Sequence, residues 1–304
     1  MERAGSSNSV QVSVIVPSWN SSKTIQRCLQ ALQDQTGDCP YEIIVVDSST
    51  DGTSEMVARH FPTVRLLHFS DRCFPGDARN LGIAQARGQI LAFTDADCIV
   101  ERDWIVTLVE AHKNPSPNIG GSVDIGNPER PVTWAAYFCE FSQWIPQSES
   151  RHMVEIPTCN LSLKRWIFEQ HGPFLAGTRC SDTAFHWKLG QAGFPPLFVP
   201  AIRISHLNID QLRRFLRHEF HLGWAFARIR ITERKLGLVK QYALLLGSPA
   251  LPLLLFYRIA RRVFRARTYR RQFLLFSPLV FLGVAAWSAG EFIGYLLGPR
   301  GPRA

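Results

Sequence analysis

Short apolar runs alternate with amphipathic stretches along the first hundred residues of this 304-residue chain. The runs are rich in β-branched and aliphatic residues and have the length of buried strands. Between the first two, Ile25, Cys28, Leu29 and Leu32 recur at helical spacing. Strands that alternate with helices form parallel sheets with right-handed crossovers, so the pattern predicts an α/β fold. We expect Pro17 to end the first strand. The runs are residues 12–16, 42–46, 64–67 and 90–93.

The pattern continues less regularly as far as residue 232. The predicted strands there are 118–124 and 198–204, and the predicted helices are 104–112, 183–192 and 208–232. Beyond this point the chain becomes apolar and basic. We therefore predict a disordered lead-in over residues 1–10, an α/β domain over 11–235 and a helical region over 236–304.

Composition and charge narrow the class of protein. Hydrophobic residues make up 46% of the chain, which is enough for a large core. The net charge is +9, and seven arginines fall within residues 258–271. A basic cluster beside apolar segments favours anionic lipid as a partner, and no nucleic-acid-binding motif accompanies it. Seven scattered cysteines without a C-x-x-C pair fit a reducing cytosol, and the polar N-terminus is no secretory signal.

Polar residues follow the predicted strands at the edge where a parallel sheet binds ligands. Ser18 follows the first strand, Asp47 the second, and Asp95 and Asp97 the fourth. Two carboxylates at the end of a buried strand are unfavourable unless something compensates them, and oxygen ligands suit a divalent cation. A bare D-x-D is more often an acidic turn. Three such loops in this order favour a site for a ribose, a base and a metal.

Three other features each have a structural and a functional interpretation. By spacing alone, Ser181-Asp182 before an amphipathic helix is a helix cap. His206 follows a late strand, and a lone histidine is more often structural. The aromatic residues of segment 131–150 recur at helical spacing, which is more typical of a core than of a platform for sugars.

Three motifs in order resemble those of family 2 glycosyltransferases with the GT-A fold. They are VSVIVPSWN (12–20), EIIVVDSSTDGT (42–53) and ARNLGIAQARGQILAFTDADC (78–98). The resemblance implies a Rossmann-like, mostly parallel sheet flanked by helices, followed here by a C-terminal apolar helical hairpin. One position departs from the pattern: many members have two aspartates after the second strand, where this chain has Asp47 and Ser48.

The resemblance also implies which residues bind the donor. It puts Ser18 beside the nucleotide, Asp47 on the base, Arg79 at the nucleotide or its phosphates, and Asp95 near the ribose. The full set implied to bind the nucleotide-sugar is Pro17, Ser18, Asn20, Asp47, Arg79 and Asp95.

The metal and the catalytic base are implied in the same way. Asp97 would ligate Mg²⁺ or Mn²⁺ at the diphosphate, with His206 as a second ligand. Such an ion acts as a Lewis acid, because negative charge develops on the diphosphate as the sugar–phosphate bond breaks. The family's acidic pair is reduced here to Ser181-Asp182, so Asp182 would take the proton from the acceptor hydroxyl. Direct displacement inverts the anomeric configuration.

The expected reaction moves a single sugar from a UDP-linked donor to a lipid-linked or cell-envelope glycan acceptor. The Q-x-x-R-W signature of processive synthases is absent, since residues 221–224 read HLGW. A nucleotidyltransferase or a Rossmann dehydrogenase would need a glycine-rich loop after the first strand, which PSWNSSKT lacks. The alternative is a catalytically inactive, nucleotide-sugar-binding membrane scaffold, against which the intact acids argue.

The C-terminal region predicts membrane association, with the catalytic domain cytoplasmic and membrane lipid as a partner of residues 208–297. Residues 242–257 are short and hold two prolines, whereas residues 273–297 are long enough to span. If both spanned, the arginines between them would lie outside, against the positive-inside tendency. The first segment is then interfacial or re-entrant, or both form a hairpin at the surface beside the basic helix 208–232. A hairpin that caps the soluble domain is the structural alternative, and the number of spans stays open.

Overall fold

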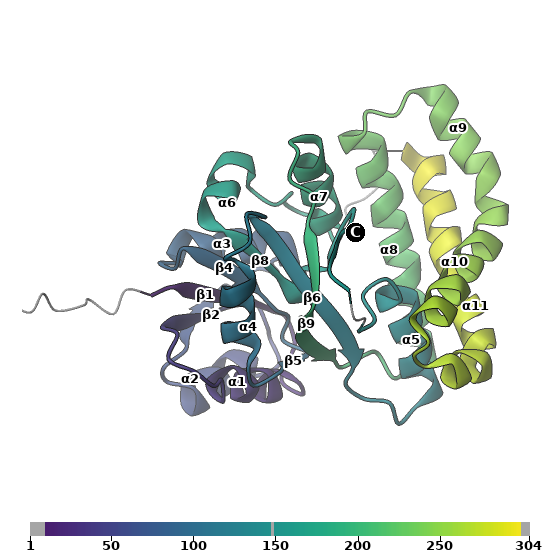
Figure 1. The fold of residues 1–304 in the computed structure, drawn as a ribbon. Helices are drawn as coiled ribbons and strands as arrows, with labels where there is room; N and C mark the ends of the chain where they lie inside the picture. The colour runs from purple at the N-terminus through teal and green to yellow at the C-terminus, as the bar shows by residue number, and fades with distance from the viewer. Residues whose placement is uncertain (1–9, 147–148, 299–304) are drawn as a thin grey trace, which may run out of the picture.

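The computed structural model describes residues 10–146 and 149–298. Within these ranges a nine-stranded sheet lies beside a block of long helices (Figure 1). The predicted lead-in over 1–10 lies, apart from Val10, outside the described residues. The strands are β1 (Val12–Ser18), β2 (Tyr41–Asp47), β3 (Arg65–His68), β4 (Ile90–Phe93), β5 (Cys98–Val100), β6 (Asn118–Ile125), β7 (Arg151–His152), β8 (Leu161–Lys164) and β9 (Leu197–His206).

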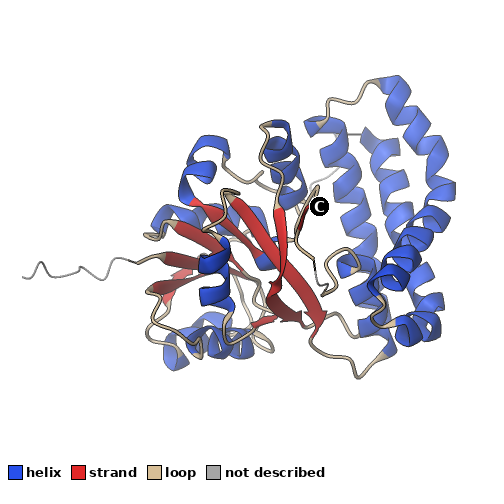
Figure 2. Ribbon diagram, in the orientation of Figure 1, coloured by secondary structure: helices blue, strands red, loops and turns tan. Residues whose placement is uncertain are grey.

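Helices flank the sheet and then gather at one side of it (Figure 2). Short 3₁₀ turns at Thr158–Asn160 and Ser248–Ala250 accompany them. The helices are α1 (Ile25–Gln33), α2 (Thr53–His60), α3 (Pro75–Gln85), α4 (Trp104–Ala111), α5 (Pro131–Phe141), α6 (Arg165–His171), α7 (Ser181–Gln191), α8 (Leu212–Glu233), α9 (Leu238–Gly247), α10 (Leu251–Ala266) and α11 (Arg270–Leu297).

The sheet is parallel in its first half and mixed afterwards. Its strand order is β3-β2-β1-β4-β8-β6-β9-β5, with β7 paired to β9. The first four strands in this order run parallel, which confirms the predicted α/β fold. β8 runs antiparallel to both β4 and β6, while β5 and β7 run antiparallel to β9. The sequence analysis did not predict the short strands β5 and β7.

The first strand is longer than predicted, because β1 continues through Pro17 to Ser18. β1 pairs with β4 only from Val12 to Ile15, and beyond that point it pairs with β2 alone. The proline nitrogen, which has no hydrogen to donate, therefore removes no bond to β4. Pro17 thus extends the strand into the loop instead of ending it.

The core lies on both faces of the central strands. Val14, Ile15 and Val16 of β1 are wholly buried, as expected for a parallel strand covered on both sides. Residues 131–146 of the aromatic segment form α5 and the turn after it. Their aromatic side chains pack inside, which confirms the core interpretation; they are Trp134, Tyr137, Phe138, Phe141 and Trp144.

The helix α11 packs along α8, and also contacts α5 and α10 (Figure 1). Gly290 and Gly294 of α11 form a G-x-x-x-G pair, and a Cβ atom at Gly290 would lie 1.9 Å from the carbonyl oxygen of Phe220. In α8, a Cβ atom at Gly223 would lie 2.1 Å from the carbonyl oxygen of Trp287. The two helices therefore meet backbone to backbone, as small residues permit.

The predicted apolar helical hairpin at the C-terminus is confirmed. Two segments, Leu238–Ala266 and Arg270–Leu297, are long and apolar enough to cross a membrane by length and composition. The first contains α9 and α10, and the second is α11. The division of the chain at residue 235 falls between α8 and α9 and stays a prediction.

Candidate active site

A cleft of about 1100 Å³ opens at the carboxyl ends of β1 and β4 and extends toward α8, α10 and α11. This edge of the sheet is where the order of strands and helices predicts ligands to bind. Two of the nine predicted site residues, Asn20 and Asp47, are not among the described residues that line it. The seven that line it are Pro17, Ser18, Arg79, Asp95, Asp97, Asp182 and His206.

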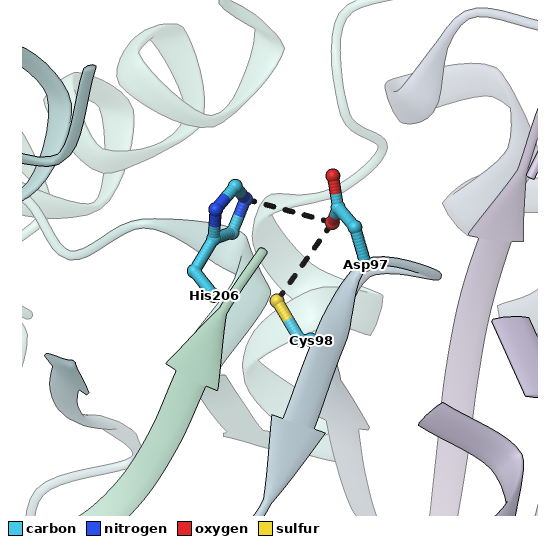
Figure 3. A group of neighbouring side chains, drawn as sticks. All are labelled: Asp97, Cys98 and His206. Carbon is cyan, nitrogen blue, oxygen red and sulfur yellow. Dashed lines mark hydrogen bonds and ion pairs between the residues drawn. The ribbon is translucent and has the colours of Figure 1, made fainter. Parts of the chain in front are cut away.

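Asp97 and His206, which are far apart in the sequence, lie side by side and both line the cleft (Figure 3). Antiparallel pairing of β5 with β9 puts Cys98 directly opposite His206, and Asp97 immediately precedes β5. The Nε2 atom of His206 lies 3.5 Å from Oδ1 of Asp97. The strand that the sequence analysis missed is therefore the one that assembles this pair.

The imidazole of His206 is held for ligation by a neighbouring amide. Its Nδ1 lies 3.0 Å from Oδ1 of Asn208. Because the amide oxygen only accepts, Nδ1 donates to it, and in the neutral ring the lone pair lies on Nε2, which faces Asp97. The ring also packs on Phe141, at 4.6 Å between centroids.

The donor set at this point fits a hard divalent cation. Ligand atoms of Asp97, Cys98 and His206 lie within 4.8 Å of one another. Burial, and next a hydrogen bond with Cys159, raise the pKa of the Cys98 thiol well above its usual range. A thiol is a soft ligand that Mg²⁺ and Mn²⁺ do not favour, so the carboxylate of Asp97 and the imidazole of His206 are the groups available for such an ion. The cleft walls also raise the pKa of Asp97 by desolvation, which His206 partly opposes.

Arg79 and Asp95 form an ion pair beside the Asp97–His206 pair. The Nη2 atom of Arg79 donates to Oδ1 of Asp95 at 2.5 Å, and the arginine side chain is only 4% exposed. Among the described residues, the buried Nε of Arg79 and the buried hydroxyl of Ser18 have no hydrogen-bond partner. Both atoms belong to residues that line the cleft. Buried unpaired donors are unfavourable, so oxygen atoms of a bound nucleotide would stabilise them.

Asp47 and Asn20 instead hold the loops after β1 and β2 together. The carboxylate of Asp47 is wholly buried and accepts from the Ser49 hydroxyl at 2.5 Å and from His68 Nδ1 at 3.0 Å. The backbone N–H of Asn20 donates to Ser49 Oγ at 2.7 Å, and the side-chain Oδ1 of Asn20 accepts from the backbone N–H of Thr50 at 3.0 Å. Contact of Asp47 and Asn20 with the nucleotide stays a prediction.

Asp182 lies in the first turn of α7 and lines the cleft. The N-cap residue of α7 is Cys180, and it makes no side-chain capping bond. The simple cap interpretation of Ser181-Asp182 is therefore wrong. Oδ1 of Asp182 accepts from the Thr183 amide at 2.9 Å, and the positive end of the helix favours its negative charge.

Glu155 supplies a second carboxyl group that the sequence analysis did not predict. It lines the same cleft as Asp182. Burial, and next the charge of Asp182, raise the pKa of Glu155. The family's acidic pair is replaced in the sequence by Ser181 and Asp182. In the folded chain Glu155 lies near Asp182, and no local sequence motif identifies Glu155 as a residue of the site.

Other charged cleft residues were also missed. The guanidinium of Arg72 lies 3.7 Å from the ring centroid of Trp19, and the buried Nε of Arg179 has no hydrogen-bond partner among the described residues. On α8, Glu219 is only 2% exposed, and burial followed by the charge of Glu140 raises its pKa well above the usual range. The arginines suit an anionic substrate group, whereas burial disfavours the charged form of Glu219.

The arrangement of sheet, Asp-x-Asp pair and flanking helices is that of a GT-A transferase. Over 94% of this chain and 87% of the other, the structure superposes with TM-score 0.61 and 21% identity on mannosyltransferase PcManGT from Pyrobaculum calidifontis, solved in complex with GDP-Man and Mn²⁺. Staphylococcus aureus TarS 1–349 in complex with UDP-GlcNAc gives TM-score 0.54 and 16% identity over 92% and 90% of the two chains. Both likenesses concern the fold.

The sequence comparisons identify the family within this class. The glycosyl transferase family 2 profile matches residues 13–179. Glycosyltransferase AglE of Haloferax volcanii is 30% identical over 77% of this chain and 79% of its own length. Glycosyltransferase GlyG of Streptococcus pneumoniae is 32% identical over 74% and 79%. The chain belongs to glycosyl transferase family 2, and it is a glycosyltransferase.

Proposed function

We propose that the chain transfers one sugar from a UDP-linked donor to a lipid-linked or cell-envelope acceptor, in a metal-dependent and inverting reaction. The observation that carries this proposal is the joint lining of one cleft by Asp97, His206 and Asp182. A cation site and a candidate base are thereby available to the same bound substrates. The nucleotide sugars in the two structural neighbours, one of them bound with Mn²⁺, support this class of donor and cofactor.

Asp97 and His206 would hold Mg²⁺ or Mn²⁺, whose Lewis acidity would stabilise the departing diphosphate. Arg79 and Ser18 would contribute from the protein itself, because their N–H and hydroxyl groups have no partner among the described residues and would bind phosphate oxygen atoms of the donor. Asp95 would lie near the ribose, and its bond with Arg79 keeps that guanidinium in place before the donor binds. Pro17, Asn20 and Asp47 complete the proposed nucleotide contacts.

Asp182 would act as the base. It would accept the proton of the acceptor hydroxyl while that oxygen attacks the anomeric carbon from the face opposite the nucleotide. Attack from the opposite face inverts the anomeric configuration. Glu155 would influence the readiness of Asp182 to take a proton, because a nearby carboxyl group changes its electrostatic surroundings.

The acceptor would enter from the side of the C-terminal helices. The cleft continues between apolar side chains such as Leu255 and Ile259 and the guanidinium of Arg262, all on α10. Apolar and cationic walls together suit an amphiphilic acceptor with an anionic group. This supports a lipid-linked substrate and an enzyme held at a membrane, with its catalytic domain in the cytoplasm.

Replacement of Asp182 by asparagine tests the proposed base. We expect the turnover number with a UDP-sugar and a lipid-linked acceptor to fall by about 10²- to 10⁴-fold, the usual contribution of a general base. Affinity for UDP should stay the same. Asp103→Asn is the matched control, because Asp103 is exposed at the N-terminus of α4 and makes no capping bond. Turnover retained in Asp182→Asn, with the anomeric outcome unchanged, would remove Asp182 from the mechanism.

A further inference from the structure

Both ends of α11 are bonded to the part of the chain that carries the cleft. At the N-terminal end, the Tyr269 hydroxyl donates to Oδ1 of Asp124 in β6 at 2.6 Å, and its ring lies 5.0 Å from that of Trp134. At the other end, the Tyr295 hydroxyl accepts from Nη1 of Arg230 in α8 at 3.1 Å. The helix has 28 residues, a length of about 42 Å. A helix of this length that crossed a bilayer would leave only one end beside the catalytic domain.

The inner side of α11 is part of the wall of the cleft. Val284, Trp287 and Glu291 line it. The Glu291 side chain, 6% exposed, lies 3.6 Å from Arg230 and accepts from Tyr295 at 2.8 Å. The only acid in the apolar segment 273–297 is thus paired with α8.

For α11 to be surrounded by lipid, α8 would have to enter the bilayer with it. That helix carries five arginines, at positions 213, 214, 217, 228 and 230. Arginine at the centre of a bilayer is unfavourable unless it is paired or snorkels to the interface. The contact between α8 and α11 therefore opposes a spanning position for α11.

The outer side of α9, α10 and α11 carries the features of a surface that binds lipid. Between residues 234 and 290 the chain has ten lysines or arginines and no acidic residue. In Figure 1 the three helices stand together beside α8, at the side of the molecule away from β1–β3. The large apolar side chains exposed on them are Leu238, Val239, Tyr242, Leu246, Leu253, Leu254, Tyr257, Phe264, Leu274, Leu275, Phe281, Leu282, Phe292, Leu296 and Leu297.

We propose that α9, α10 and α11 dock flat on an anionic bilayer, so that neither candidate segment crosses it. The apolar side chains enter the boundary between headgroups and acyl chains, and the arginines bind anionic headgroups. This inference rests on the membrane association proposed above and adds its geometry. It also keeps all seven arginines of residues 258–271 on the cytoplasmic side, in accord with the positive-inside tendency.

Labelling of one introduced cysteine separates docking from crossing. The full chain is bound to sealed phosphatidylcholine–phosphatidylglycerol vesicles with its catalytic domain outside, and a membrane-impermeant maleimide is added. Arg267→Cys reports whether the exposed turn between α10 and α11 is accessible to the maleimide, and Ser70→Cys reports the same for the catalytic domain. The unsubstituted chain gives the background reaction of the native cysteines. We expect both variants to react before detergent is added. Reaction of Arg267→Cys only after detergent would overturn the proposal, as would a chain that does not sediment with the vesicles.

A charge series tests the lipid class. Replacing Arg261, Arg265 and Arg271 by glutamine should weaken binding to the anionic vesicles on the order of 10²-fold, since each basic residue contributes about a factor of five. The matched control replaces three exposed arginines of the sheet domain by glutamine, namely Arg27, Arg59 and Arg102. The net charge then changes by the same amount, and we expect the affinity for vesicles to be retained. Equal weakening in both triple variants would overturn the proposal. Sugar transfer to a detergent-dispersed acceptor is measured in parallel, so a failure of the proposed function is seen separately.

Discussion

Replacing Gly290 by alanine should destabilise the chain, although alanine is the better helix former. The added Cβ atom would lie 1.9 Å from the carbonyl oxygen of Phe220 and 2.9 Å from the amide nitrogen of Trp224. A carbon–oxygen contact needs about 3.3 Å, so α8 and α11 would have to separate locally by about 1.4 Å. Both contacted atoms belong to the backbone of α8, so no side-chain rotation relieves the overlap.

The size of the effect follows from two opposing contributions. Overpacking of a well-packed interface costs about 1–3 kcal/mol, and the upper end applies where only backbone can move. The helix propensity of alanine returns about 1 kcal/mol. The free energy of unfolding should therefore fall by about 2 kcal/mol. For a chain of this size, that corresponds to a decrease in Tm of about 4–8 °C.

Thermal unfolding of the detergent-solubilised chain, followed by circular dichroism, measures this change. Gly190→Ala in α7 is the matched control, because no atom lies within 4 Å of its Cβ position. We expect Gly190→Ala to leave the Tm unchanged or to raise it slightly. If Gly290→Ala were as stable as Gly190→Ala, the close contact between α8 and α11 would be refuted, and with it the argument against a spanning α11.

Two other predictions concern the cleft. Asn208→Ala should weaken Mn²⁺ binding about tenfold, measured calorimetrically, because the His206 tautomer loses its acceptor; unchanged affinity would contradict that positioning role. Burial and the charge of Glu140 raise the pKa of Glu219 in the folded chain. The stability that the protonated Glu219 contributes is therefore complete below the pKa of this residue in the unfolded chain, and it is lost as pH rises through the pKa in the folded chain. Denaturant unfolding at several pH values should therefore show that the free energy of unfolding of Glu219→Gln increases relative to that of the wild type as pH rises. A constant difference would exclude this titration.

The strands β1, β2 and β4 were predictable because their signal is local. Parallel strands covered on both faces are continuous apolar runs, and polar side chains begin where the strands end. This rule located Ser18, Asp95 and Asp97 at one edge, and the structure brings them to one cleft. The same rule located Asp47 at this edge, but in the folded chain its carboxylate forms hydrogen bonds with Ser49 and His68.

The parts that the sequence analysis missed depend on contacts between distant segments. Strand β5 has three residues and gains its identity only by pairing with β9. Glu155 lies in an irregular segment and approaches Asp182 only after the chain folds. Neither feature has a periodicity or a motif of its own.

The surroundings of the C-terminal hairpin, lipid or protein, could not be predicted from the sequence for a different physical reason. An apolar helix pattern predicts burial, but a lipid bilayer and a protein interior give the same signal. The spacing of Gly290 and Gly294 was the available indication that another helix packs closely against α11. The polar partner of Glu291, Arg230 on α8, is visible only in the folded chain.

The proposed function requires a nucleotide diphosphate and a divalent cation to meet at Asp97. Calorimetric titration of UDP into the detergent-solubilised chain, with and without Mn²⁺, tests it most directly for the wild type, Asp97→Ala and the control Asp103→Ala. We predict UDP binding that requires Mn²⁺ in the wild type and in Asp103→Ala, and that is lost in Asp97→Ala. Equal UDP affinity in all three proteins, whether or not Mn²⁺ is present, would show that Asp97 holds no cation at the nucleotide.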